Sequence, residues 1–451
     1  MKRRTFIRNT SMGAVTALLA PRMLTSCKNA NDVVNVGFLG VGGRGSGLLA
    51  KFMTLEGVQV AGIYDPFKDR REKHAKAVNE KYEKFNAENK NKEGYKFGKC
   101  VVYDNFRSLI EDKNIDAVVI ATPDHWHVPL SYAAVDAGKD VYVEKPLGLT
   151  IEQGQILRKK VHEKNAILQY GTQQRSGHQF WLAAELTVRE RIGKLERMDV
   201  WCLGQNRDYN GSIEPIPVPA GFNYDTWLGP APVSPYTKDR CTSEGSWYIY
   251  DNAIGFIAGW GAHPLDIAQW GNRSDNTGPV SYKGTGSFFP EGGLFNTINK
   301  WDIHCEYANG VKMHFFSFDK AKEYVGGYRK QVHNHGTTFF GTNGWVSVDR
   351  RGIYASDPEI LKLEVAPGEE MCYVSKDHQN NFIECIRSRK QPISNIDAAV
   401  RSDAISHLGD ILIRTGVDEL KWDPVKEELV DPTPEMTALM HRDQRKPYDI
   451  I

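Results

Sequence analysis

The apolar positions of residues 33–170 form short continuous runs that alternate with helical stretches. Runs rich in Val, Ile and Ala with few polar interruptions are typical of strands buried on both faces of a sheet. Strands are expected at 33–39, 58–64, 115–121, 140–143 and 166–170, and helices at 46–55, 106–111, 131–137 and 151–164. Strands that alternate with helices at this spacing predict an α/β domain with a doubly wound parallel sheet.

The pattern changes after about residue 171. The β-rich runs, bounded by turn residues, are at 196–203, 301–307, 311–318 and 344–348. They indicate a second domain with a sheet of its own. Residues 206–260 are rich in Pro, Gly and aromatic residues and are too long for a plain loop, so we expect a functional insertion or cap there.

Composition and charge narrow the range of partners. Of the 451 residues, 41% are hydrophobic and 25% are charged, as in ordinary globular proteins, and the formal net charge is +1. A nucleic-acid binder usually carries a basic excess or stripe, and no apolar stretch reaches the length of about 18 residues that spans a bilayer. The composition therefore favours a small-molecule partner and argues against nucleic acid.

Residues 1–26 have the pattern of an export signal. Two consecutive arginines followed by Thr-Phe-Ile, and then a short apolar run, resemble a twin-arginine signal. The segment LTSC at 24–27 resembles a lipoprotein processing site, with Cys27 as the lipidated residue; an ordinary cleaved signal is the alternative. We therefore expect a periplasmic protein with a lipid anchor. Without residues 1–26 the chain has 52 basic against 56 acidic residues, so the signal conceals a mildly acidic protein.

The first strand runs directly into GVGGRG at 40–45, which fits the GxGxxG pattern of dinucleotide-binding loops. The glycines allow a tight turn, close approach to a pyrophosphate and close helix–strand packing, and the following helix offers N–H groups to phosphates. Asp65 ends the next strand, twenty residues beyond the motif. An acid there hydrogen-bonds the ribose hydroxyls and repels a 2′-phosphate. NAD is therefore the predicted cofactor, and Arg70 and Arg71 leave NADP as an alternative.

Two more strands end in polar loops, TPDHWH at 122–127 and EKP at 144–146. Ligands of doubly wound sheets lie at the carboxyl ends of the strands, so both loops are expected beside the cofactor. The predicted cofactor contacts are Gly40, Gly42, Gly43, Arg44, Gly45, Asp65, Thr122, Pro123, His125, His127, Glu144 and Lys145. Packing is the alternative for His125 and His127. No third ligand is in register with them, and no metal site is predicted.

These motifs, in this order and spacing, resemble those of the glucose–fructose oxidoreductase/inositol dehydrogenase (Gfo/Idh/MocA) family, in its exported branch with a twin-arginine signal. The likeness continues through GAHPLD at 261–266, GTNGW at 341–345 and WDP at 422–424. It implies an NAD-binding Rossmann domain at 33–171 and, at 172–451, an α/β substrate domain with a large, mainly antiparallel open sheet. The exposed face of such a sheet favours a homo-oligomer.

Oxidation of a sugar hydroxyl needs a base for the proton, whereas the nicotinamide takes the hydride. The resemblance implies that Lys145 and His263 are the catalytic pair. Burial beside the cofactor lowers the pKa of a lysine, and a histidine has an unperturbed pKa near the working pH. The family commonly has an aspartate four residues before the histidine, a position that is Gly259 here. Asp266, one helical turn after His263, is predicted to take over its role.

Aromatic and basic residues are candidates for holding the sugar, together with His263. Trp247, Tyr248 and Trp260 either stack on a pyranose ring or belong to the core. Arg175 either contacts the substrate or pairs with an acid at a domain interface. For His263, capping of the next helix is the alternative to a role in the site.

Export places the predicted enzyme where free nicotinamide nucleotide is scarce, so NAD is expected to stay bound through the catalytic cycle. One prediction is a dehydrogenase that oxidises the C3 hydroxyl of a sugar or glycoside to a ketone. An alternative resembles glycoside hydrolase family 109, in which transient C3 oxidation leads to elimination, hydration and re-reduction. Because Gly259 replaces the family aspartate, a non-catalytic NAD- or sugar-binding protein is a third interpretation.

Overall fold

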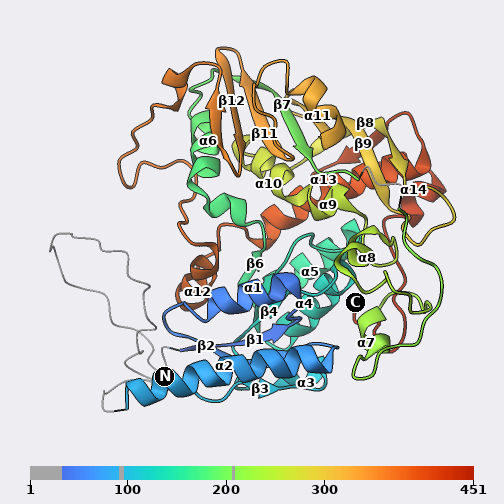
Figure 1. Ribbon diagram of the computed structural model, residues 1–451. Helices are drawn as coiled ribbons and strands as arrows, with labels where there is room; N and C mark the ends of the chain where they lie inside the picture. Colours follow the sequence, from blue (N-terminus) through green and yellow to red (C-terminus); the bar gives the residue numbers. More distant parts are fainter. Residues whose placement is uncertain (1–32, 91–95, 206–208) are drawn as a thin grey trace.

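The structure is a computed structural model, and it describes residues 33–90, 96–205 and 209–451. The predicted signal at 1–26 and its Cys27 lie outside the described residues. The described chain contains two sheets, and Figure 1 shows the first, in blue and cyan, below the second. Among the described residues no helix combines the length and the apolar character needed to cross a membrane.

The first sheet has six parallel strands in the order β3-β2-β1-β4-β5-β6. The strands are β1 (Val34–Leu39), β2 (Val58–Tyr64), β3 (Val101–Val102), β4 (Ala117–Ile120), β5 (Asp140–Val143) and β6 (Leu168–Tyr170). The strand order reverses between β1 and β4, which opens a crevice at the carboxyl ends of these strands. The doubly wound parallel sheet predicted from the sequence is therefore confirmed.

Helices cover both faces of this sheet. One face carries α1 (Gly43–Phe52), α2 (Lys68–Glu88) and α12 (His378–Ser388), and the other α3 (Phe106–Glu111), α4 (His127–Asp136) and α5 (Ile151–Lys164). Helix α12 comes from the far end of the chain yet lies beside α1 in Figure 1. The rings of Phe52 and Phe382 meet there edge to face, with centroids 6.4 Å apart. The late part of the chain thus completes the core of the first sheet.

Two helices begin earlier than the sequence pattern predicted. Helix α1 begins at Gly43, inside the glycine motif, and not at residue 46. This brings N–H groups of the motif itself to the helix N-terminus. Helix α4 begins at His127 and not at residue 131, because Pro129 lies in its first turn, where a proline is tolerated. A short 3-10 turn at Asp124–Trp126 precedes it.

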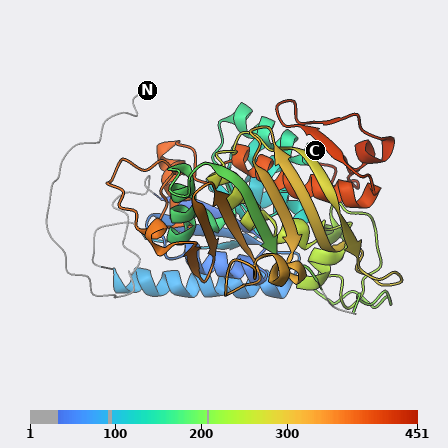
Figure 2. The same ribbon diagram turned by 90° about the horizontal axis from the view of Figure 1, so that it is seen from above.

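The second sheet has nine strands in the order β13-β12-β11-β7-β10-β9-β8-β14-β15, and only the pair β7 and β10 is parallel. The strands are β7 (Leu195–Cys202), β8 (Pro279–Phe288), β9 (Ile298–Tyr307), β10 (Lys312–Ser317), β11 (Gly336–Gly341), β12 (Gly344–Asp349), β13 (Gly352–Ala355), β14 (Leu420–Asp423) and β15 (Glu428–Val430). The mainly antiparallel sheet agrees with the predicted fold class. Figure 2 shows its strands in front of helices.

One face of the second sheet packs on helices and the other is largely open. The helices on the covered face are α6 (His178–Val188), α9 (Phe256–Gly259), α10 (Ala262–Gly271) and α13 (Ile396–Thr415). On the opposite face α11 (Phe318–Tyr324) packs against Trp201 and Phe316, which alternate with core-facing neighbours along β7 and β10. The remaining short helices are α7 (Tyr224–Leu228), α8 (Ser243–Tyr248) and α14 (Pro434–Ala438), with 3-10 turns at Gln173–Ser176 and Pro358–Leu361.

Candidate active site

Two cavities adjoin at the carboxyl edge of the first sheet. The glycine-loop cavity, of about 390 Å³, is lined by the ends of β1 and β2, by the loop after β4 and by residues of the insertion between 226 and 247. The lysine cavity, of about 600 Å³, is lined by Lys145, His263 and residues from both domains. The residues that line both cavities are Ala121, Thr122, Asp124 and Trp247.

The glycines of the loop have different structural roles. Gly40 has a φ of +88°, and a Cβ there would lie 2.8 Å from the carbonyl oxygen of Ala121. A Cβ on Gly45 would lie 2.2 Å from the carbonyl oxygen of Gly40, so Gly45 serves helix–strand packing and does not line the cavity. Gly42 and Gly43 do line the cavity, and a Cβ on Gly43 would meet nothing within 4 Å. The N-terminus of α1 thus faces open space in which a pyrophosphate fits.

Asp65 lies at the end of the same cavity. Two backbone N–H groups donate to its carboxylate at 2.9 and 3.0 Å. Burial raises the pKa of Asp65, whereas Arg70, 3.7 Å away, lowers it. Arg71 instead pairs with Asp104 and lines neither of the two cavities. A fixed carboxylate with free acceptor capacity suits a ribose diol, so the residues present fit NAD.

Lys145 follows β5 and projects into the lysine cavity. Its Nζ donates a hydrogen bond to the carbonyl oxygen of Gly259 at 2.6 Å. Burial lowers the pKa of Lys145, and the negative charge of Glu144 opposes this shift. Burial also raises the pKa of Asp124 to about 8, so that carboxyl group is largely neutral at pH 7. A lysine with a lowered pKa suits the role of general base.

His263 lines the same cavity from the first turn of α10. Burial, reinforced by the positive charge of Lys145, holds its pKa well below the ordinary value, so the imidazole is neutral. Its Nδ1 is buried and has no hydrogen-bond partner among the described residues. Among the described residues no carboxylate is hydrogen-bonded to this nitrogen. A Cβ on Gly259 would have only Phe256 Cδ1 nearby, at 3.8 Å, so there is space for a side chain at that position.

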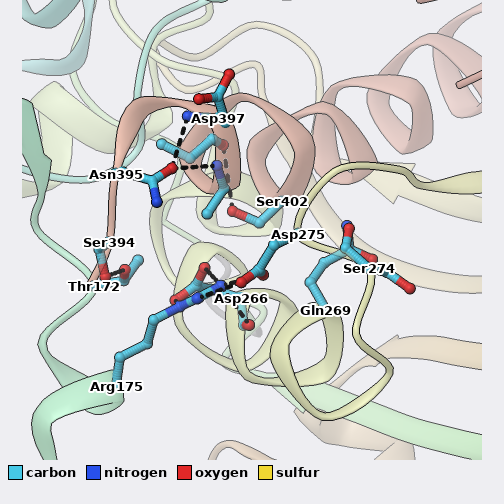
Figure 3. A network of polar contacts seen from close by, with 12 residues as sticks. Thr172, Arg175, Asp266, Gln269, Ser274, Asp275, Ser394, Asn395, Asp397 and Ser402 are labelled. Atoms are coloured by element: carbon cyan, nitrogen blue, oxygen red, sulfur yellow. Dashed lines mark hydrogen bonds and ion pairs between the residues drawn. The ribbon is translucent and has the colours of Figure 1, made fainter. Parts of the chain in front are cut away.

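The structure corrects the role predicted for Asp266, and for Arg175 it agrees with the alternative of pairing with an acid. Figure 3 shows the two side chains facing each other, and Arg175 Nε donates to Asp266 Oδ2 at 2.7 Å. Arg175 Nη2 also donates to Asp275 at 2.6 Å. Both members of the pair are buried and neither lines the two cavities. Asp266 consequently does not orient His263, and Arg175 joins the turn after β6 to α10 instead of contacting a substrate.

Tyr248 and His125 also lie away from the two cavities. Tyr248 is 3% exposed and packs against three phenylalanine rings, which makes it a core residue and not a sugar platform. Trp247, the preceding residue of α8, lines both cavities. His125 is buried with Nε2 2.9 Å from the carbonyl oxygen of Trp227, so packing is its role here. The sequence alone does not reveal which of two adjacent aromatic residues packs in the core and which lines a cavity.

The remaining predicted residues line the cavities. The glycine-loop cavity contains Gly40, Gly42, Gly43, Asp65, Thr122 and Pro123, and the lysine cavity contains Arg44, His127, Glu144, Lys145, Trp247, Trp260 and His263. Sequence reasoning missed six polar residues of the lysine cavity, namely Lys51, Asp124, Gln173, Gln174, Arg350 and Gln379. Asp124 lies within the TPDHWH motif, which was a usable signal. Arg350 comes from the turn between β12 and β13, and nothing near it in the sequence marks it.

A glycine loop that fits NAD, next to a cavity that holds a lysine of lowered pKa, defines an NAD-binding oxidoreductase. Residues 34–172 match the family model described as oxidoreductase family, NAD-binding Rossmann fold. Residues 200–338 match the model described as oxidoreductase family, C-terminal alpha/beta domain. The chain belongs to the Gfo/Idh/MocA family, and its first domain binds NAD. The family and the cofactor predicted from the sequence are thereby confirmed.

Curated relatives match over part of the chain. A glycosyl hydrolase family 109 protein of Shewanella baltica and an alpha-N-acetylgalactosaminidase of Shewanella oneidensis are each 34% identical to it over 140 residues. These matches cover 31% of this chain and 27% of each relative. The matched segment is therefore too short for the activity of the whole relatives to be assigned to this chain.

Solved structures resemble the fold over most of the chain. The aldose-aldose oxidoreductase from Caulobacter crescentus is 16% identical with a TM-score of 0.57, over 86% of this chain and 99% of that one. GenD2 from gentamicin A biosynthesis, solved with NAD, is 16% identical with a TM-score of 0.57, over 89% and 99%. At this level of identity the likeness concerns the fold.

Proposed function

We propose that this protein oxidises the C3 hydroxyl of a sugar or glycoside with an NAD that stays bound. The observation that carries the proposal is the convergence of Lys145, His263 and Asp124 on one cavity that adjoins the glycine-loop cavity. NAD, when bound, accepts a hydride at nicotinamide C4. Lys145 takes the hydroxyl proton, and the neutral His263 orients the hydroxyl by a hydrogen bond. Trp260 and Trp247 offer ring faces to the sugar.

The insertion supports retention of the cofactor. Seven residues that line the glycine-loop cavity come from the insertion, namely Thr226, Trp227, Cys241, Thr242, Ser243, Ser246 and Trp247. They cover a cavity whose other walls belong to the first domain. A cofactor covered in this way leaves only when the cap opens, so dissociation is expected to be slow. Slow release suits an enzyme that regenerates NAD within its own cycle.

A second candidate function is net glycoside hydrolysis, favoured by the relatives of glycosyl hydrolase family 109. A C3 ketone acidifies the hydrogen on C2, so a base can remove it while the C1–oxygen bond to the aglycone breaks. Water then adds to the double bond, and the ketone is reduced again. The lysine cavity holds two groups that can act as bases, Lys145 and His263, and one neutral acid, Asp124, that can protonate the leaving oxygen.

A product screen separates the two functions. The purified protein is incubated with a panel of glycosides, its cofactor is released with acid, and both are analysed by mass spectrometry. A product lighter by two hydrogen atoms indicates dehydrogenation, whereas free sugar and aglycone indicate hydrolysis. Loss of NAD during gentle dialysis would contradict retention of the cofactor.

A lysine variant tests both candidate functions. We expect Lys145→Ala to lower turnover by about 10²- to 10⁴-fold, the usual contribution of a general base. Lys51→Ala is the matched control, since Lys51 lines the same cavity but is paired with Asp377. Full turnover by Lys145→Ala would contradict both enzyme proposals and would favour the non-catalytic interpretation.

We further propose that the protein is exported and anchored by a lipid at Cys27, and that it forms a homo-oligomer. The sequence of residues 1–27 supports export, and the open face of the second sheet supports self-association. Radiolabelled fatty acid should appear in the wild-type protein and be absent from Cys27→Ala. Sedimentation of the purified protein gives its oligomeric state.

A further inference from the structure

Three side chains with metal-ligating atoms gather on the second sheet, outside both cavities: Asp302, His304 and His314. Asp302 and His304 are two residues apart on β9, so they project from the same face of the sheet. His314 of β10 is the direct antiparallel partner of His304. The strand register alone therefore brings the three together, and it does so on the face that carries α11.

The distances between their ligand atoms suit one ion. All three ligand atoms lie within 4.8 Å of one another. Asp302 Oδ1 is 2.6 Å from His314 Nε2 and 3.9 Å from His304 Nε2. A tetrahedral zinc ion with bonds of about 2.1 Å separates its ligand atoms by about 3.4 Å. The two distances lie on either side of this value, so rotation of the side chains is needed to reach it.

The side chains differ in the freedom that such rotations need. The side chain of His304 is 68% exposed, so it can turn toward an ion without displacing the core. The side chains of His314 and Asp302 are 14% and 24% exposed and are held in place. The two imidazole rings are stacked, at an angle of 13° with centroids 4.1 Å apart. Because a metal ion lies in the plane of each imidazole that binds it, the ring of His304 must turn out of this stack to share an ion with His314. The site therefore has two ligands held in place, His314 and Asp302, and one exposed ligand, His304, whose rotation completes it.

A second layer of contacts orients the carboxylate. Tyr324 of α11 donates its hydroxyl to Asp302 Oδ2 at 2.8 Å, which leaves Oδ1 facing the histidines. Its ring also packs against His314, with centroids 4.7 Å apart. Outer partners of this kind fix the geometry of metal ligands in proteins. The nearby cation Lys283 is paired with Glu419 at 3.6 Å, so its charge is balanced.

We propose that Asp302, His304 and His314 form a binding site for a divalent transition-metal ion, with zinc as the best match. Two imidazoles and one carboxylate favour zinc and its neighbours over magnesium or calcium, which take oxygen ligands. The fourth coordination position is left for water, since a cleft of about 330 Å³ lies beside the two histidines. The ion replaces the hydrogen bond between His314 and Asp302 and cross-links β9 to β10.

Because zinc would bind the folded chain and not the unfolded chain, it should stabilise the fold. The site can therefore be tested by zinc binding and by the melting temperature. The purified protein is stripped with a chelator and titrated with Zn²⁺ by calorimetry, and its melting temperature is measured with and without Zn²⁺. We expect a single saturable site and a higher melting temperature with zinc. His304→Ala and His314→Ala should each weaken binding by about tenfold or more.

His441→Ala is the matched control, because His441 also contacts two carboxylates, those of Glu152 and Asp443, but has no second histidine. It should leave zinc binding unchanged. His304→Ala removes a mostly exposed side chain, so its melting temperature without zinc should equal that of the wild type. The proposal is overturned if no saturable site appears, or if the double variant of His304 and His314 binds zinc as the wild type does.

Discussion

Substitution of Gly259 by aspartate tests whether Lys145 is the titrating base of the lysine cavity. The backbone carbonyl of Gly259 accepts the hydrogen bond of Lys145 Nζ at 2.6 Å, so the two residues are in direct contact. A Cβ on Gly259 has only one neighbouring atom within 4 Å, Phe256 Cδ1 at 3.8 Å. The site can therefore accept the carboxylate that the Gfo/Idh/MocA family commonly has there.

The expected shift follows from the distance. A side-chain carboxylate on residue 259 comes within about 5 Å of Nζ, given that the carbonyl of the same residue is in contact with it. At that distance and an effective dielectric constant of about 20, the two charges attract by about 3 kcal/mol. This raises the pKa of Lys145 by about two units. In the wild type burial lowers that pKa, so the aspartate opposes the effect of burial.

The assay measures how much of the amine is deprotonated at each pH. The protein is pulse-labelled with acetic anhydride, and acetylation of Lys145 is quantified by peptide mass spectrometry. The midpoint should move to higher pH in Gly259→Asp, and the pH profile of turnover should move with it. Gly259→Asn has a side chain of the same size without charge and should leave the midpoint unchanged. Equal shifts in both variants, or a turnover profile that does not follow the labelling midpoint, would show that Lys145 is not the titrating base.

Three further predictions concern the buried charges and the cap. Arg175→Ala leaves the buried Asp266 unpaired and should lower the free energy of unfolding by about 3–5 kcal/mol in urea, whereas Asp275→Asn, at a side chain 41% exposed, should cost less than about 1 kcal/mol. Because burial raises the pKa of Asp124 to about 8, the folded chain holds a proton there that the unfolded chain releases above about pH 4. The contribution of this carboxyl to the free energy of unfolding therefore falls as pH rises from about 4 to 8. Asp124→Asn should be more stable than the wild type at pH 8 but not at pH 4, and urea titrations at the two pH values test this. Trp247→Ala opens the cap over the glycine-loop cavity and should speed the loss of NAD during dialysis, measured by absorbance; unchanged retention would remove the cap from the explanation.

Local patterns determined the first sheet and its cofactor. A strand buried on both faces needs a continuous apolar run, and a loop around a pyrophosphate needs glycines, so both leave a signature within a few residues. Gly40, Gly42, Gly43 and Asp65 line the glycine-loop cavity for that reason, whereas Gly45 packs the helix on the strand. The starts of α1 and α4 were missed by a few residues, since proline and glycine are tolerated in the first turn of a helix.

Sequence patterns thus predicted the family, the Rossmann sheet, NAD and the two catalytic candidates Lys145 and His263. Which charged groups meet could be seen only in the folded chain. Arg175 and Asp266 are 91 residues apart and form an ion pair, whereas Arg350 reaches the lysine cavity from the turn between β12 and β13 of the second sheet. The difference lies in the range of the interactions. Backbone conformation depends on neighbouring residues, but the energy of a charge depends on its burial and on partners that the fold brings from distant parts of the chain.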